Sequence, residues 1–420
     1  MKKLAVQPSS DTFDLPGKYR ILVLIVCWIG FTLTSTDRSA WGPASLFVGK
    51  DLGVQLGSLG VFATSYYLGY VASNFGSGFL IDKIGGRSLI SASLAGAGTC
   101  MYLFGSTGSA TVGIAIQGII GLFAGAEYGA GIKLLSSWFR PGELGKVMGV
   151  YTSATSLGVL IANTAVPWLI DHFNWSTAYH TFGIISIMSG IICFIILKPG
   201  PVVTIAPGSD AGSASVVRSL VGNWNLVLLA LSGFGGFWGT YGFVIWSNIL
   251  IVKGRGIDHA TAGIIVATFA AMGILGKPLV GLVSDWMGGA RRIPAIFMLA
   301  LFAVMLIVFG LIETPTGFIL AAPVLGLAGY CYLPMIVALV PRLVPSSVLG
   351  TAAGSINAFW QLGSVIVPLA VGAVFVAANQ SFISAFVTLA IGPLLGMIAM
   401  LFVNERPADV QIVLDHEPNP

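Results

Sequence analysis

Residues 78–87 read GFLIDKIGGR, and 203 positions later residues 281–292 read GLVSDWMGGARR. Each stretch is a short polar gap between two long apolar runs. A motif that returns at a fixed offset is typical of a chain assembled from related repeats. The pair therefore predicts an internally duplicated protein.

The composition around these motifs belongs to a membrane protein. Hydrophobic residues make up 56% of the chain and charged residues only 9%, far from the balance of a soluble domain. Apolar runs of about 20 residues are long enough to cross a bilayer core, where the backbone satisfies its own hydrogen bonds as a helix. We expect an all-α integral membrane protein with twelve transmembrane helices at 20–47, 54–80, 88–107, 110–139, 147–170, 178–198, 223–252, 259–284, 293–312, 315–340, 348–377 and 381–403.

Six of these spans lie on each side of a segment rich in Pro, Gly, Ser and Ala, which has the composition of a flexible linker. The expected organisation is two six-helix bundles joined by that linker and flanked by short polar tails. The segments are a tail at 1–19, a bundle at 20–198, the linker at 199–222, a bundle at 223–403 and a tail at 404–420.

The basic residues indicate the orientation. With the N-terminus in the cytoplasm, the outer loops hold three: Lys50, Lys253 and Arg255. The cytoplasmic segments hold fourteen: Lys2, Lys3, Lys18, Arg20, Lys83, Arg87, Arg140, Lys146, Lys198, Arg218, Arg291, Arg292, Arg342 and Arg406. This positive-inside pattern places both termini in the cytoplasm of a multi-pass cell-membrane protein, at the inner membrane in a bacterium. The net charge of +4 then follows from topology, so we expect no nucleic-acid partner. We also expect the protein to be a monomer in the lipid bilayer.

The cysteines give no sign of a metal or a disulfide. All four, Cys27, Cys100, Cys193 and Cys331, fall inside predicted helices without CxxC spacing or histidine neighbours. The sequence contains no cofactor fingerprint and no cluster of nucleophile, base and orienting group. We therefore expect no metal, no cofactor and no enzymatic activity.

The two polar motifs resemble the paired Gly-x-x-x-Asp-Lys/Arg-x-Gly-Arg/Lys-Arg/Lys loops of the major facilitator superfamily. The second copy departs from that pattern, with Trp286 at a position that is usually basic and one extra residue before Arg291. The resemblance covers residues 20 to 403 and implies a 6+6 helix fold that alternates between inward and outward openings. It also implies that the motif residues gate this change: Gly78, Asp82, Lys83, Gly85, Arg87, Gly281, Asp285 and Arg292.

Ionisable side chains inside a membrane are costly and usually functional. Five remain once loops and tails are removed: Asp37, Arg38, Glu127, Lys133 and Lys277. Three cations thus face two acids, and a bound anion would relieve the excess positive charge in a medium of low dielectric. The charge balance favours a small anionic solute as the ligand.

Asp37 and Arg38 are neighbours in the first predicted helix, about 100° apart around its axis, so we expect them to have different partners. They resemble the Asp-Arg of helix 1 in the anion:cation symporters of the superfamily, which include sugar-acid carriers. The resemblance implies that Arg38 binds the substrate anion and that Asp37 takes part in proton coupling. A guanidinium can hold a carboxylate by two parallel hydrogen bonds. The alternative is a pair of charges that only neutralises itself.

Glu127 lies near the middle of the fourth predicted helix. A carboxyl group in an apolar setting is a candidate proton carrier. The helix-4 glutamate of the symporter family corresponds to Ala124, counted back from Trp138, so Glu127 is displaced by about one turn. The alternative is a structural pair with Arg38 or Lys133. For Lys133 itself, substrate contact and snorkelling to the membrane surface both remain open.

Lys277 is the one charge buried in the second half, and it lies about 12 Å along the helix from Asp285. Its segment resembles the Arg-Pro-x-x-Gly of helix 8 in monocarboxylate carriers, which implies contact with a substrate carboxylate. Aromatic and amide side chains are available to line the rest of a cavity: Tyr67, Tyr70, Trp238, Tyr241, Asn357 and Gln361.

These features favour a secondary active transporter with proton-coupled symport of a small organic anion, either a carboxylate or a sugar acid. Sodium is the alternative coupling ion. An anion exchanger or a monocarboxylate carrier centred on Lys277 is a second interpretation. A non-transporting membrane sensor is a remote third, because the tail at 404–420 is too short for a signalling domain.

Overall fold

The computed structural model describes residues 17–140, 143–200, 222–344 and 349–405, without the side chains of residues 75–79, 82, 285 and 349–351. Most of the expected linker and tails lies outside these ranges. The described elements are helical: α1 (Gly17–Ser39), α2 (Trp41–Asp51), η2 (Leu56–Ser58), α3 (Gly60–Gly105), α4 (Ala110–Trp138), α5 (Leu144–His172), α6 (Trp175–Ile196), α8 (Trp224–Arg255), α9 (His259–Trp286), α10 (Arg292–Leu311), α11 (Pro315–Leu343), α12 (Leu349–Ala377) and α13 (Phe382–Phe402).

The helices match the expected twelve membrane spans. Eleven segments of the described chain are long and apolar enough to cross a membrane, and α1 and α2 together make the first of them. The second arm of α3, Lys83–Gly105, is one of these eleven, and the first arm, which begins at Gly60, makes the twelfth span. The two arms are separated at Gly85, whose φ of 79° and ψ of 155° are not helical. Such a φ is readily adopted only by glycine. The polar motif at residues 78–87 is therefore the turn between the second and third spans, as predicted.

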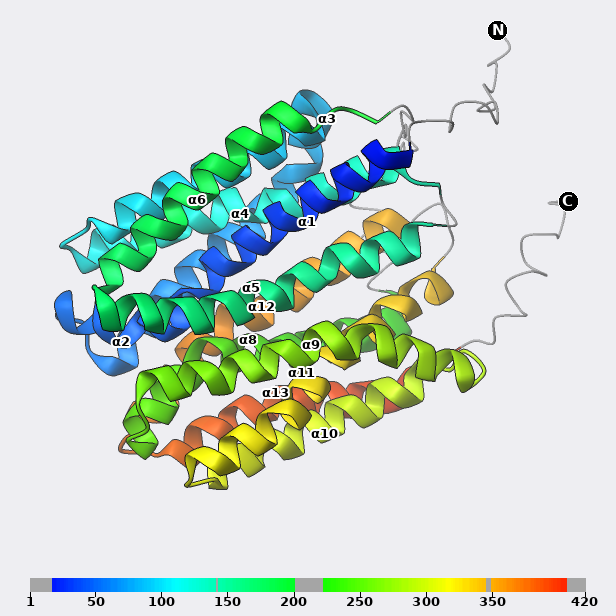
Figure 1. Ribbon diagram of the computed structural model, residues 1–420. Coiled ribbons are helices and arrows are strands. Elements are labelled where there is room, and N and C mark those ends of the chain that lie inside the picture. Colours follow the sequence, from blue (N-terminus) through cyan, green and yellow to red (C-terminus); the bar gives the residue numbers. More distant parts are fainter. Residues whose placement is uncertain (1–16, 141–142, 201–221, 345–348, 406–420) are drawn as a thin grey trace, which may run out of the picture.

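The spans pack as two groups of six (Figure 1). In the first group, α3 packs on α4 and α6, and α1 packs on α5; in the second, α8 packs on α12 and α13, and α9 packs on α11. The groups meet where α5 contacts α9 and where α3 contacts α12. The start of α1 and the end of α13 lie at one end of the molecule (Figure 1), which we call the terminal end; the other is the far end.

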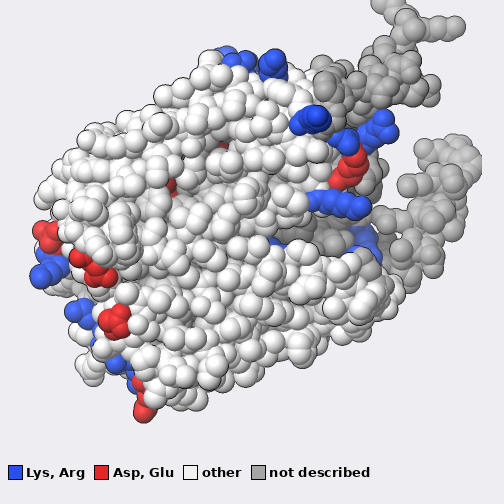
Figure 2. Space-filling model, viewed as in Figure 1, with Lys and Arg blue, Asp and Glu red and all other residues white. Residues whose placement is uncertain are grey.

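The charged side chains mark the two ends of the molecule. Figure 2 shows them at the terminal and far ends with an almost uncharged band between. Large apolar side chains such as Ile195, Leu320 and Phe402 are 68%, 72% and 68% exposed on the surface. An apolar belt of this kind is suited to the hydrocarbon core of a bilayer.

At the far end the two groups meet backbone to backbone. A Cβ atom added to Gly60 of α3 would lie 2.2 Å from the Pro368 carbonyl oxygen of α12, and one added to Gly263 of α9 would lie 2.3 Å from the Asn163 carbonyl oxygen of α5. The Asn248 side-chain amide of α8 donates a hydrogen bond to the Asn163 side-chain oxygen at 2.8 Å. No side chain fits between such surfaces, so the far end is closed.

At the terminal end, three glycines of the same helices face open space. Added Cβ atoms at Gly149 of α5, Gly281 of α9 and Gly354 of α12 would have no described heavy atom within 4 Å. Figure 2 shows a hollow between the two groups at this end, bordered by basic side chains. The contact between the groups is therefore tight at one end and loose at the other.

Candidate functional site

Arg38, near the end of α1, lies between the two groups and is surrounded by tyrosines. Its guanidinium carbon is 5.1 Å from the ring centre of Tyr241 in α8 and 5.9 Å from that of Tyr70 in α3. The rings of Tyr67 and Tyr241 are 5.5 Å apart. Cations over aromatic faces are attracted by the ring quadrupole, by about 0.5–2 kcal/mol. The structure thus brings four of the predicted site residues together.

The packing of α4 on the first arm of α3 positions these tyrosines. Added Cβ atoms at Gly121 and Gly125 of α4 would lie 1.9 Å and 2.5 Å from the carbonyl oxygens of Tyr66 and Tyr70. Glycines at such spacing allow two membrane helices to approach closely. The close contact holds the tyrosine-bearing face of α3 toward Arg38.

A small hollow of about 10 Å³ lies beside the guanidinium. Its lining consists of Arg38, Trp41, Ala63, Tyr66, Tyr67, Gln117 and Ile245. Such a volume admits about one water molecule. A sugar-sized ligand therefore needs the walls to separate.

Two donors of this lining have no partner in the described structure: the indole nitrogen of Trp41 and the hydroxyl of Tyr66. An unsatisfied buried donor costs about 1–3 kcal/mol. Together with Arg38 they form a set of donors that an oxyanion would satisfy. Trp41, Tyr66 and Gln117 were not among the predicted site residues, although Trp41 is three residues after Arg38 and Tyr66 is next to Tyr67.

Arg38 has no acidic partner within 4 Å among the described residues. Its neighbour Asp37 points elsewhere and accepts a hydrogen bond from the Ser186 hydroxyl of α6 at 2.8 Å. The other carboxylate oxygen of Asp37 is buried without a described partner. The two side chains thus have different described partners and do not form an ion pair with each other in this structure.

Glu127 of α4 is fully buried inside the first group. It accepts hydrogen bonds from the Thr34 hydroxyl of α1 and the Tyr151 hydroxyl of α5, both at 3.2 Å. No described cation lies within 4 Å of it, so the alternative ion pair with Arg38 or Lys133 is absent from this part of the chain. Hydroxyl groups can donate to a carboxylate and accept from a protonated carboxyl. The surroundings can therefore hold both forms.

Lys277 of α9 reaches across to α5. Its ammonium group donates hydrogen bonds to the hydroxyls of Thr155 and Ser156 at 3.0 Å, and it is 5.0 Å from the ring centre of Tyr330. It does not line the hollow beside Arg38. Its described partners are neutral, so it is a second cation between the two groups without a described counter-charge.

Three of the predicted lining residues lie apart from the hollow. The Trp238 ring packs toward α13, where its indole nitrogen donates to the Thr388 carbonyl at 2.9 Å. It fits there because Gly392 has no side chain: a Cβ atom at Gly392 would lie 2.5 Å from the ring. Gln361 is buried on α12 and accepts from the Ser364 hydroxyl at 3.4 Å, and Asn357 is partly buried on the same helix.

The predicted gating residues of the first motif lie at the terminal end. Lys83 is exposed beside the Gly85 turn. The Nε atom of Arg87 donates to the Phe194 carbonyl of α6 at 2.8 Å, and its guanidinium stacks on the Phe194 ring at 4.4 Å. Gly78 and Asp82 lie in the helix, but their side-chain environment is outside the described part.

In the second motif, the Asp285 side chain is also outside the described part of the structure. Arg292 donates to the Leu401 carbonyl of α13 at 2.5 Å. The carboxylate of Glu405, just after α13, accepts from the backbone nitrogens of Arg291 and Arg292 at 3.0 Å and pairs with Arg342 at 2.5 Å. An acidic group at a helix N-terminus is favourable, and this cap of α10 was not predicted.

Comparisons with known proteins agree with this architecture. A family model described as Major Facilitator Superfamily matches residues 27–368 and 256–417. The probable galactarate/D-glucarate transporter GarP of Escherichia coli (strain K12) is 23% identical, over 94% of this chain and 97% of its own length. The D-galactonate transporter of Escherichia coli O6:H1 is 22% identical, over 92% and 96%.

Among solved structures, a bacterial homolog of the human lysosomal transporter Spinster matches this fold in its inward-facing, unoccupied conformation. The TM-score is 0.77 at 16% sequence identity, and the match covers 94% of this chain and all of the other. At this level of identity the similarity concerns the fold.

Proposed function

The chain belongs to the major facilitator superfamily of membrane transporters, and from that membership we propose that it carries a small organic anion, of the sugar-acid class, by proton-coupled symport. One observation carries the proposal: Arg38 has no described acidic partner and lines a hollow with the unpartnered donors of Trp41 and Tyr66. A carboxylate satisfies all three, because its two oxygens accept paired bonds from a guanidinium and further bonds from N–H and O–H groups. The names of the galactarate/D-glucarate and D-galactonate relatives support the sugar-acid class.

Alternating access follows from the same proposal. The far end is closed by backbone contact at Gly60 and Gly263, the terminal end is looser, and the central hollow is too small for a sugar acid. The substrate therefore enters after the groups rock apart at one end. The excess of basic side chains at the terminal end favours a cytoplasmic position for that end. The moving parts are the bundles at 20–198 and 223–403, joined by the linker at 199–222, in a monomer.

Proton coupling is assigned to Glu127 and Asp37. Both carboxyls are buried among hydroxyls without a described cation, a setting in which an ionised form is costly. A proton on Glu127 offsets that cost when the transporter reorients with its anion. The driving ion is decided by comparing uptake into proteoliposomes under an imposed proton gradient with uptake under a sodium gradient.

A ligand screen tests the substrate class. We expect galactarate, D-glucarate or D-galactonate to raise the melting temperature of the purified protein, since ligand at 100 times its Kd stabilises the folded state by about 2.7 kcal/mol. Galactitol, which has the same carbon chain without carboxylates, is the matched control and should have no effect. Equal stabilisation by galactitol, or none by any carboxylate, would contradict the proposal.

Lys277 distinguishes diacids from monoacids. We propose that its ammonium, which has only neutral partners in the described structure, takes the second carboxylate of a sugar diacid when the walls separate. Lys277→Gln should then weaken galactarate binding about 10- to 100-fold, because a charge-assisted hydrogen bond contributes about 1.5–3 kcal/mol. Binding of D-galactonate, with one carboxylate, should change less than threefold. The measurement is isothermal titration calorimetry, and equal losses for both acids would remove Lys277 from this role.

An anion exchanger or monocarboxylate carrier centred on Lys277 is the second candidate, favoured by the bridge that Lys277 makes between α9 and α5. It makes the opposite prediction for the two cations. Binding of a monocarboxylate would then depend on Lys277 and survive loss of Arg38, and counterflow would be independent of the proton gradient.

A further inference from the structure

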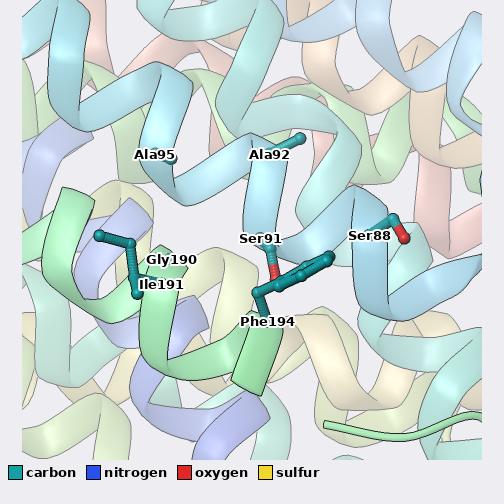
Figure 3. Close-up of a pocket in the computed structure, with 7 residues that line it drawn as sticks. All are labelled: Ser88, Ser91, Ala92, Ala95, Gly190, Ile191 and Phe194. Carbon is teal, nitrogen blue, oxygen red and sulfur yellow. The ribbon is translucent and has the colours of Figure 1, made fainter. Parts of the chain in front are cut away.

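A groove on the membrane-facing surface lies between the second arm of α3 and α6 (Figure 3). Its volume is about 350 Å³, and its lining consists of Ser88, Ser91, Ala92, Ala95, Gly190, Ile191 and Phe194. The four α3 residues share one helix face, three or four positions apart, and all are small. An added Cβ atom at Gly190 would lie 2.9 Å from the Ser91 carbonyl oxygen, so α6 lies directly against α3 at the groove floor.

The groove contains an unsatisfied polar group. Ser91 is 7% exposed, and its hydroxyl is buried without a hydrogen-bond partner in the described structure. Many other helical serines and threonines here donate to a backbone carbonyl of the preceding turn, as Thr99 does to Ala95 at 2.7 Å. A buried hydroxyl at membrane depth needs an acceptor. The Ser91 hydroxyl therefore marks a place for a ligand oxygen.

A fixed cation lies one helical turn from Ser91 toward the terminal end. Arg87 is held by its Nε bond to the Phe194 carbonyl and by stacking on the Phe194 ring, which also lines the groove. Its two terminal nitrogens have no partner among the described residues. They are available for an anion at the membrane surface, where basic pockets between helices bind anionic headgroups.

We propose that this groove binds one anionic phospholipid, with its phosphate on Arg87, an ester oxygen on Ser91 and an acyl chain along Ala92 and Ala95. Positions 87, 91 and 95 are spaced by about 6 Å along the helix. Phosphate, ester and chain follow one another in the same order in a glycerophospholipid. The site is independent of the central hollow beside Arg38.

A second copy of the chain fits the groove less well. A twofold contact centred on this face would bring Arg87 of both copies to the same membrane depth at the edge of one interface, since such an interface uses the same patch on both copies. Like charges in that position repel in a medium of low dielectric. Charge complementarity thus favours a negatively charged lipid.

Native mass spectrometry of the detergent-purified full chain tests the site with two probes, dioleoyl phosphatidylglycerol and dioleoyl phosphatidylcholine. The wild type should retain phosphatidylglycerol preferentially. Arg87→Gln should reduce that preference about fivefold, the effect of one basic side chain near an anionic surface. Ser91→Ala should weaken both lipids, and Ala92→Phe, which fills the groove, should remove the tightest bound lipid. Lys146→Gln, an exposed cation on α5 at the same end, is the matched charge control and should bind as the wild type does.

Three results would overturn the proposal. The lipid preference could survive Arg87→Gln, or phosphatidylglycerol could bind Ala92→Phe as it binds the wild type. The wild type could also be a dimer that Ala92→Phe dissociates, in which case the groove belongs to a second copy. Thermal melting of each variant shows that it is folded, and the conservative Ser91→Ala change keeps the test valid if Ala92→Phe fails to fold.

Discussion

Arg38→Gln should abolish tight binding of the transported acid, with an increase in Kd of about 100-fold or more. The guanidinium donates two charge-assisted hydrogen bonds to one carboxylate, and losing them removes about 3 kcal/mol. Glutamine cannot replace either the charge or the paired geometry. Isothermal titration calorimetry with the acid found in the screen measures the change. Arg38→Lys keeps the charge without the fork, so its Kd should fall between those of the wild type and Arg38→Gln.

The chain offers a matched control for this change. Arg255, at the end of α8, also stacks on an aromatic ring, with its guanidinium carbon 4.3 Å from the centre of Phe382, and it donates to the Gly310 carbonyl at 2.8 Å. It lies at the far end, so Arg255→Gln removes a stacked arginine without touching the hollow. Binding should persist in Arg255→Gln. If Arg38→Gln binds the acid within threefold of the wild type, Arg38 is not the anion site.

Glu127→Gln should separate transport from its driving force. The amide has nearly the shape of the carboxyl: its oxygen can accept from one of the two hydroxyls, of Thr34 or Tyr151, and its nitrogen can donate to the other, but it cannot take up or release a proton. Proton-driven accumulation in proteoliposomes should fall at least tenfold. Exchange of labelled for unlabelled acid without a gradient should continue, and its rate should no longer respond to pH.

Two further variants locate the proton site. Asp37→Asn removes the other buried carboxyl, which Ser186 contacts, and Glu143→Gln removes a carboxylate that pairs with Arg20 at 3.0 Å near the terminal end. Glu143→Gln should accumulate substrate as the wild type does. Normal accumulation by Glu127→Gln would exclude Glu127 as the carrier, and uncoupling by Asp37→Asn alone would transfer that role to Asp37.

The scaffold could be predicted from the sequence because each of its causes is local. Apolar runs of bilayer length become helices, and the turn at Gly85 is encoded by a polar motif with a glycine. The separation of Asp37 from Arg38 follows from the 100° step between neighbouring helical residues. Each of these predictions depends only on the sequence within a few turns of the residue concerned.

The lining of the hollow could not be predicted, because it depends on helix rotation and on distant partners. Trp41 shares a helix face with Arg38, because Ala40 between them keeps αR angles and residues three apart lie on one face, but the direction of that face is set by the distant helices that pack on α1. Trp238 was predicted to line the cavity because it is aromatic. It packs on α13 instead, because Gly392, 154 residues later, has no side chain. The cap that Glu405 forms on α10 could not be predicted either, because the short polar segment around Glu405 contains no capping motif.

The glycines at the far end allow close backbone contact because they have no side chain, and this makes substitutions at these positions unusual in their effect. A methyl group at Gly60 or Gly263 collides with a carbonyl only while that end is shut. A larger side chain at either position destabilises the conformation with the far end closed but not the one with the far end open. Each 1.4 kcal/mol of destabilisation changes the ratio of the two conformations tenfold. Natural substitutions at these positions would change the side of the membrane to which the empty transporter is open at rest. They would do so without altering any residue that contacts the substrate.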